Sequence, residues 1–120
     1  MANDEPFSTA DLFACHKATG CPVMKAKAEL LSMEPELRSR VFRAALRQPD
    51  EWGGLRDPIE NEPATGELVG AAARAAEMLV SETAGRGRGQ RIWFEQKRIL
   101  AAQGITWFSP PDMNPWTVFD

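Results

Sequence analysis

Residues 8–47 read STADLFACHKATGCPVMKAKAELLSMEPELRSRVFRAALR. Apolar residues recur every three or four positions in three separate stretches, which is the spacing of an amphipathic α-helix. Gly20 suits the left-handed position just after a helix, while Pro22 and Pro35 suit the first turn of a new helix. The pattern therefore predicts three short helices joined by tight turns over residues 9–48.

The sequence also indicates where the first helix begins and which faces of the next two are buried. Ser8 or Thr9 is the expected N-cap, and Asp11, three residues after Ser8, makes a variant of the capping box. The expected buried residues are Val23, Ala26, Leu30 and Met33 in the second helix and Leu37, Val41, Ala44 and Ala45 in the third. These are the features of an all-α, mainly helical protein.

The rest of the chain divides into three regions. Residues 49–66 break the helical spacing and predict an acidic loop, which Trp52, Leu55 and Ile59 are expected to pin to the core. Residues 67–103 predict a helical hairpin. Residues 104–120 are rich in aromatic residues and prolines, and they predict an extended tail packed on the core. We expect a single domain, residues 1–120, with about five short helices.

Within the hairpin, Thr65 is the expected cap of a helix over about residues 66–83. A second helix is expected from Gln90 to Gln103, with Gly104 in the left-handed position after it. The segment Ile105–Phe108 has the composition of a short strand.

Composition narrows the function classes. The chain has 120 residues and a formal net charge of −3, from 14 basic and 17 acidic side chains. A general nucleic-acid-binding protein usually has a basic excess. No run of about 18 apolar residues is present, so no membrane span and no membrane partner are expected. The acidic segment Met1–Phe7 lacks the features of a secretion signal, which predicts a cytoplasmic protein with reduced cysteines.

One segment resembles a known family. The residues that carry the resemblance are Thr19 and Gly20 at the end of one helix and Met24, Lys27 and Leu30 on the next. In this register residues 9–47 resemble the N-terminal ubiquitin-associated-like (UBA-like) helical domain of translation elongation factor Ts. The resemblance covers about a third of the chain, and it implies a three-helix module that docks onto another protein.

The chain also departs from that family. Pro22 stands where the family usually has glycine, and the acidic residue and cysteine that follow the methionine in the family are missing after Met24. Residues 49–120 do not resemble the rest of the factor. Nucleotide exchange is therefore not part of what the resemblance implies.

The segment Gly85-Arg86-Gly87-Arg88-Gly89-Gln90-Arg91 is a candidate anion site. Free N–H groups at a helix start attract anions, and Arg86, Arg88 and Arg91 add charged donors. The segment has neither the ending of a phosphate-binding P-loop nor a strand before it. RNA backbone, a nucleotide phosphate or an acidic protein surface are the ligands to consider, and a flexible connector between helices is the alternative.

Cys15, His16 and Cys21 are the residues that would carry thiol or metal chemistry. A closed zinc site needs four ligands, and adjacent helical residues point about 100° apart, so Cys15 and His16 do not converge on one ion. We therefore expect small buried thiols, with no catalytic residue, no metal and no cofactor.

The aromatic residues supply candidate partner-binding side chains, namely Trp52, Trp107, Trp116 and Phe119. Burying such a side chain is worth roughly 1.5–3 kcal/mol, so the tail either wraps over its own helices or inserts into a partner. Trp116 and Phe119 are the two expected to reach outward.

These observations favour a small non-enzymatic binding protein of bacterial type, working as a regulator, inhibitor or assembly factor on a protein partner. The second hypothesis is an RNA-associated or translation-linked factor that uses the Gly-Arg segment. The third is a thiol or metal enzyme centred on Cys15, His16 and Cys21.

Overall fold

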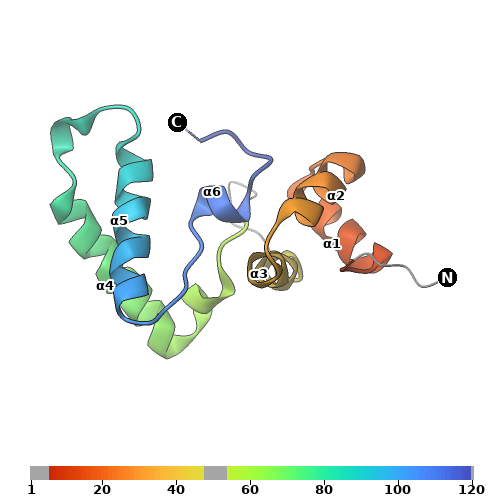
Figure 1. Cartoon of the computed structure of the whole chain (residues 1–120), viewed down its shortest axis with the longest axis horizontal. Helices are drawn as coiled ribbons and strands as arrows, with labels where there is room; N and C mark the ends of the chain where they lie inside the picture. The colour runs from red at the N-terminus through yellow and green to blue at the C-terminus, as the bar shows by residue number, and fades with distance from the viewer. Residues whose placement is uncertain (1–5, 48–53, 120) are drawn as a thin grey trace. The chain divides into compact units, whose positions relative to one another are not determined.

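The computed structural model describes residues 6–47 and 54–119, and these are mainly helical (Figure 1). Neither range contains a β-strand, so the all-α class predicted from the sequence is confirmed. The expectation of a strand over Ile105–Phe108 is wrong, because a strand needs a neighbouring strand to accept its hydrogen bonds and the described residues offer none.

The chain forms two compact units. The first unit contains residues 1–56 and 110–117, and the second contains residues 57–109 and 118–120. The region expected to be one tail, residues 104–120, thus contributes to both units.

The first unit is built from α1 (Thr9–Thr19), α2 (Val23–Ser32), α3 (Pro35–Ala45) and the short α6 (Pro110–Met113). The three helices predicted over residues 9–48 are α1, α2 and α3. Helix α1 contacts both α2 and α3, and α6 contacts α3. The fully buried apolar side chains of this unit include Cys15, Ala26, Leu30, Val41, Leu55 and Met113.

The ends of α1 follow the local signals. The backbone N–H of Asp11 donates to Ser8 Oγ at 3.1 Å, and the N–H of Ser8 donates to Asp11 Oδ2 at 3.4 Å. This is the predicted capping box, and it satisfies two amides at a helix start. Gly20 has a φ of 74°, as expected for the left-handed residue that ends a helix.

Two buried hydrogen-bond clusters hold the C-terminal segment. In the first unit, fully buried Asn114 accepts from the N–H of Leu55 at 2.8 Å and donates to the carbonyls of Leu55 and Pro110 at 2.8 and 2.9 Å. In the second unit, Asp57 Oδ2 accepts from the N–H of Phe108 at 2.9 Å. These contacts join backbone groups that are far apart in sequence.

The prolines predict an extended tail over residues 104–120, but Pro110–Met113 form the helical turn α6. Proline has no N–H, and the first N–H groups of a helix lack an intrahelical partner in any case. Pro110 and Pro111 therefore start this turn without losing a hydrogen bond.

The second unit is built from the 3₁₀ turn η1 (Pro58–Asn61), α4 (Pro63–Leu79), the 3₁₀ turn η2 (Glu82–Ala84) and α5 (Arg88–Ala102). Helices α4 and α5 lie side by side as the predicted hairpin (Figure 1).

Helix α4 starts earlier than the sequence predicts. Its N-cap is Glu62 and its first residue is Pro63. Thr65, the predicted cap, instead donates its hydroxyl to the carbonyl of Ile59 at 2.9 Å. The second half of the predicted loop over residues 49–66 is therefore largely helical.

The core of the second unit consists of Ile59, Val69, Ala72, Leu100 and Trp107, with Trp93, Ile99 and Ile105 packed against it. The small side chains of Ala72 and Ala76 are buried on the face of α4. Gln96 of α5 donates to the backbone carbonyl of Val69 at 3.2 Å. A Cβ atom at Gly66 would lie 2.6 Å from the backbone oxygen of Glu60, so glycine is required where η1 crosses α4.

Candidate functional site

The connection from α4 to α5 borders the best candidate site. Helix α4 ends at Leu79, η2 follows, and α5 begins after Gly87. Gly87 is the N-cap of α5, has a φ of 80° and provides no side-chain cap. The first amides of α5 therefore add a partial positive charge at this end of the helix.

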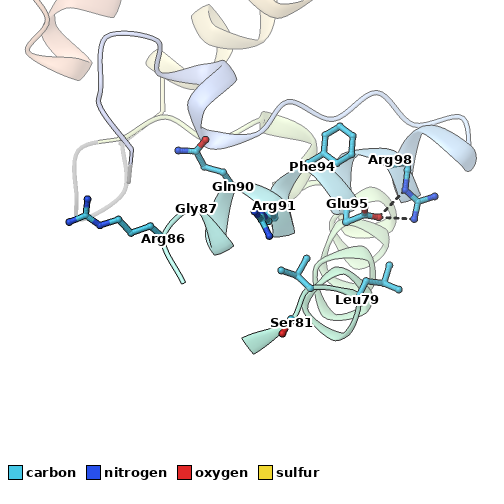
Figure 2. A pocket seen from close by; sticks show the side chains of 10 residues that line it. Leu79, Ser81, Arg86, Gly87, Gln90, Arg91, Phe94, Glu95 and Arg98 are labelled. Atoms are coloured by element: carbon cyan, nitrogen blue, oxygen red, sulfur yellow. Dashed lines mark hydrogen bonds and ion pairs between the residues drawn. The ribbon is translucent and has the colours of Figure 1, made fainter. Parts of the chain in front are cut away.

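A groove of about 770 Å³ lies beside this connection (Figure 2). Its lining comes from the C-terminal end of α4, the connection and one face of α5. The lining residues are Leu79, Val80, Ser81, Arg86, Gly87, Gln90, Arg91, Phe94, Glu95 and Arg98.

The groove is positively charged. It contains three arginines and one glutamate, a formal net charge of +2, in a chain whose net charge is −3. Arg98 pairs with Glu95, with 2.7 Å between Arg98 Nη2 and Glu95 Oε2. The side chains of Arg86 and Arg91 have no hydrogen bond or ion pair with another residue that the structure describes.

The groove also exposes large apolar side chains. Phe94 is 66% exposed and Leu79 is 60% exposed, and both line the groove. Keeping such side chains in water forgoes the roughly 1.5–3 kcal/mol that burying each would provide. A surface that combines exposed apolar side chains with arginines has the composition of a protein-binding surface.

The structure brings together two of the three arginines predicted to bind an anion. Arg86 and Arg91 line the groove, whereas Arg88 donates from Nε to the backbone carbonyl of Ser81 at 3.3 Å. Arg88 is thus used inside the connection, where it ties the start of α5 to the end of α4.

Sequence reasoning missed Phe94, Arg98 and Leu79 as site residues. The signal for the first two was the helical spacing from Arg91, since residues three, four and seven positions apart share a face of a helix. Leu79 comes from the other helix, and only the packing of α4 on α5 places it in this groove.

The predicted partner-binding aromatics have different surroundings. Trp107 is 2% exposed in the core of the second unit, and its indole N–H donates to Glu60 Oε2 at 2.9 Å. In this structure its side chain presents no surface to a partner. Trp116 is half-buried in the first unit. Trp52 lies outside the described residues.

Phe119 lies near the groove. Its ring packs edge to face on Trp93, with 5.6 Å between the ring centroids. Its carbonyl accepts a hydrogen bond from the side chain of Gln90, a groove residue, at 2.9 Å. The end of the chain therefore holds one wall residue of the groove in place.

The cysteine and histidine residues of the first unit do not form a nucleophile pair. His16 Nδ1 lies 2.6 Å from the carbonyl oxygen of Cys21, not from a thiol. Burial raises the pKa of Cys15 to about 11, and the nearby Cys21 adds to the rise. Burial also raises the pKa of Cys21. Both thiols are therefore protonated at neutral pH, the unreactive form.

Residues 6–47 and 54–119 contain neither a candidate metal site nor a candidate membrane span. No group of three or more His, Cys, Asp or Glu side chains is placed to hold a metal ion. Within the same ranges, no helix combines the length and apolar character needed to cross a bilayer.

Comparison with known proteins adds no relative: no protein-family model, curated protein or solved structure matches the chain.

Proposed function

We propose that this protein is a small non-enzymatic binding protein that docks on a protein partner through the groove between α4 and α5. The observation that carries the proposal is that Arg86 and Arg91, whose side chains have no hydrogen bond or ion pair with a described residue, line the same groove as the exposed ring of Phe94. Such a protein would act as a regulator, an inhibitor or an assembly factor.

The RNA-associated hypothesis remains the second candidate, because arginines beside an exposed aromatic ring also suit a single strand. Two observations favour protein over RNA. Only one of the large apolar side chains in the groove, Phe94, has a ring on which a base can stack. The chain as a whole also has a formal net charge of −3, whereas nucleic-acid-binding proteins usually have a basic excess.

The thiol-enzyme hypothesis has less support. A nucleophilic cysteine needs a lowered pKa, and burial moves the pKa of Cys15 and Cys21 the other way. His16 is engaged with a backbone carbonyl.

We also infer that the N-terminal helices are a UBA-like unit, and that most of residues 104–120 complete the core instead of reaching into a partner. Three helices over residues 9–45 and the burial of Trp107 and Met113 support these inferences. A cytoplasmic location and a bacterial origin belong to the same proposal.

Affinity capture from the native cell, with the full chain as bait and with and without nuclease, tests the proposal. We expect a protein that nuclease does not remove and that is lost with Arg91→Glu and with Phe94→Ala. The matched controls are Arg74→Glu, on the exposed part of α4, and Phe13→Ala, another exposed phenylalanine. Each variant is first checked for an unchanged circular dichroism spectrum.

Capture that survives both groove variants would remove the groove from the proposal. A captured set that disappears on nuclease treatment would favour the RNA-associated hypothesis.

A further inference from the structure

Building on the proposed function, we propose that the groove binds a short acidic peptide segment of its partner. Carboxylates of the segment would pair with Arg86 and Arg91, and an apolar side chain between or beside them would pack on Phe94 and Leu79.

The charges of the groove support an acidic occupant. The groove has a formal net charge of +2, opposite in sign to the −3 of the whole chain. Glu95 already neutralises Arg98, so the remaining positive charge lies on Arg86 and Arg91. Guanidinium groups bind carboxylates through two parallel hydrogen bonds, which gives these pairs both strength and a fixed geometry.

The spacing of the charges supports an extended occupant over a single small anion. Figure 2 shows Arg86, Arg91 and Arg98 in that order along the groove. Helical rise alone separates Arg91 from Arg98 by about 10 Å along the axis of α5. Arg98 is paired with Glu95, so the two charges left for the occupant are Arg86, before the N-cap Gly87, and Arg91, in the first turn of α5, whose side chains Figure 2 shows apart. One phosphate or carboxylate does not reach both, whereas successive side chains of a peptide can.

The apolar side chains and the size of the groove support a short segment. Phe94 and Leu79 come from different helices and are both more than half exposed. The volume of about 770 Å³ lies within the roughly 300–1,000 Å³ of pockets that enclose small ligands. It therefore accommodates a few side chains, as when a peptide inserts its anchor residues between two helices.

The surroundings disfavour a polyphosphate chain. Glu77 on the last turn of α4 and Glu82 in η2 are both exposed, and both flank the residues that form the wall from Leu79 to Ser81. A nucleic acid leaving the groove on this side would meet these carboxylates. A peptide needs acidic residues only opposite Arg86 and Arg91.

A displayed library of random peptides of about twelve residues, selected on the full chain, tests the inference. We expect enriched peptides to carry Asp or Glu within a few positions of Phe, Leu, Ile or Trp. A fluorescein-labelled representative should bind in an anisotropy titration, and its affinity should fall at least about tenfold with Arg86→Glu, Arg91→Glu or Phe94→Ala. Arg74→Glu should leave the affinity unchanged, and replacing the acidic residues of the peptide by Asn and Gln should weaken binding as strongly as the arginine variants.

No enrichment, enrichment of neutral or basic peptides, or an affinity insensitive to the arginine variants would overturn the inference. Tighter binding of a labelled oligouridylate that displaces the peptide would also overturn it, in favour of RNA. If the native partner is still lost with Phe94→Ala while the library selects peptides without acidic residues, the proposed function stands and only the acidic occupant is rejected. If the groove variants capture the native partner as well as the unchanged protein does, the proposed function fails whatever the library selects.

Discussion

Arginines in the two units of this protein have different roles. In the first unit, Arg38 of α3 donates to the carbonyls of Leu30 and Met33 at 2.8 and 2.6 Å. These carbonyls belong to the end of α2, where backbone acceptors lack the N–H donors of a further helical turn, although Leu30 also accepts from the N–H of Met33 at 3.3 Å. In the second unit, the side chains of Arg86 and Arg91 make no hydrogen bond or ion pair with a described residue.

The surroundings of an arginine, and not its residue type, thus decide its role. Arg38 stabilises a helix end because two backbone carbonyls of that end lie within its reach. Arg91 sits on an exposed face of α5 and lines the groove, so it remains available to an outside acceptor. Removing a polar group that bonds inside the protein, such as Arg38, should lower stability. Removing one that bonds nothing inside the protein, such as Arg91, should weaken partner binding.

The largest effect is expected at Asn114, whose fully buried side chain makes three hydrogen bonds to backbone groups. Asn114→Ala leaves the N–H and C=O of Leu55 without their partner. An unsatisfied buried group costs roughly 1–3 kcal/mol, so the free energy of unfolding should fall by about 3 kcal/mol. Urea denaturation measures it, with Asn61→Ala, at an exposed asparagine, as the control. Equal effects of the two changes would contradict the buried role.

Arg38→Ala should reduce the free energy of unfolding by about 2 kcal/mol, since hydrogen bonds from a charged donor contribute roughly 1.5–3 kcal/mol each and this side chain is partly exposed. Arg38→Lys keeps the charge but not the forked donor geometry, so it should recover only part of the loss. Arg47→Ala, at an exposed arginine, is the control in thermal unfolding. Full recovery by lysine would show that charge alone matters.

Two glycines of α4 differ in their surroundings, so the same substitution to alanine should change the stability of the protein in opposite directions. A Cβ at Gly66 would lie 2.6 Å from the backbone oxygen of Glu60, so Gly66→Ala should destabilise by about 1–2 kcal/mol. At Gly70 the nearest atom is Arg74 Nη1 at 3.5 Å, an ordinary contact. Gly70→Ala should therefore stabilise by about 0.5–1 kcal/mol through helix propensity. A melting temperature that shifts in the same direction for both variants would contradict the close crossing of η1 and α4.

The smallest effect on stability is expected at Arg86 and Arg91, the arginines that we propose to bind the partner. The double change Arg86→Ala and Arg91→Ala should alter the free energy of unfolding by no more than about 0.5 kcal/mol, because neither side chain has a described partner to lose. Guanidinium denaturation measures the free energy of unfolding of the double variant and of Arg38→Ala under the same conditions. A loss as large as that of Arg38→Ala would mean that the fold itself uses the groove arginines.

Most helix positions could be predicted from the sequence, because their signals are local. The Ser8–Asp11 capping box and the left-handed Gly20 depend on groups only a few residues away. The start of α4 was mistaken because two candidate signals, Pro63 and Thr65, lie two residues apart. The hydroxyl of Thr65 donates a hydrogen bond to the carbonyl of Ile59, and hydrophobic periodicity does not predict that contact.

The candidate site was predictable only in part, for the same reason. Arg86 and Arg91 stood out in the Gly-Arg segment, but Arg88 stood out equally and is bound to Ser81. Trp107 looked like a partner-binding residue, yet Glu60 accepts its N–H from 47 positions away in the sequence.

Local sequence signals suffice to predict that the chain is helical, where most helices begin and end, and which segment is rich in arginine. The packing of distant segments selects which arginines and aromatic rings bond or pack within the protein and which remain at its surface. The physical reason is range: helix caps and faces depend on neighbours within a few residues, whereas the partners of Trp107 and Asn114, like the two walls of the groove, meet only when distant segments pack together.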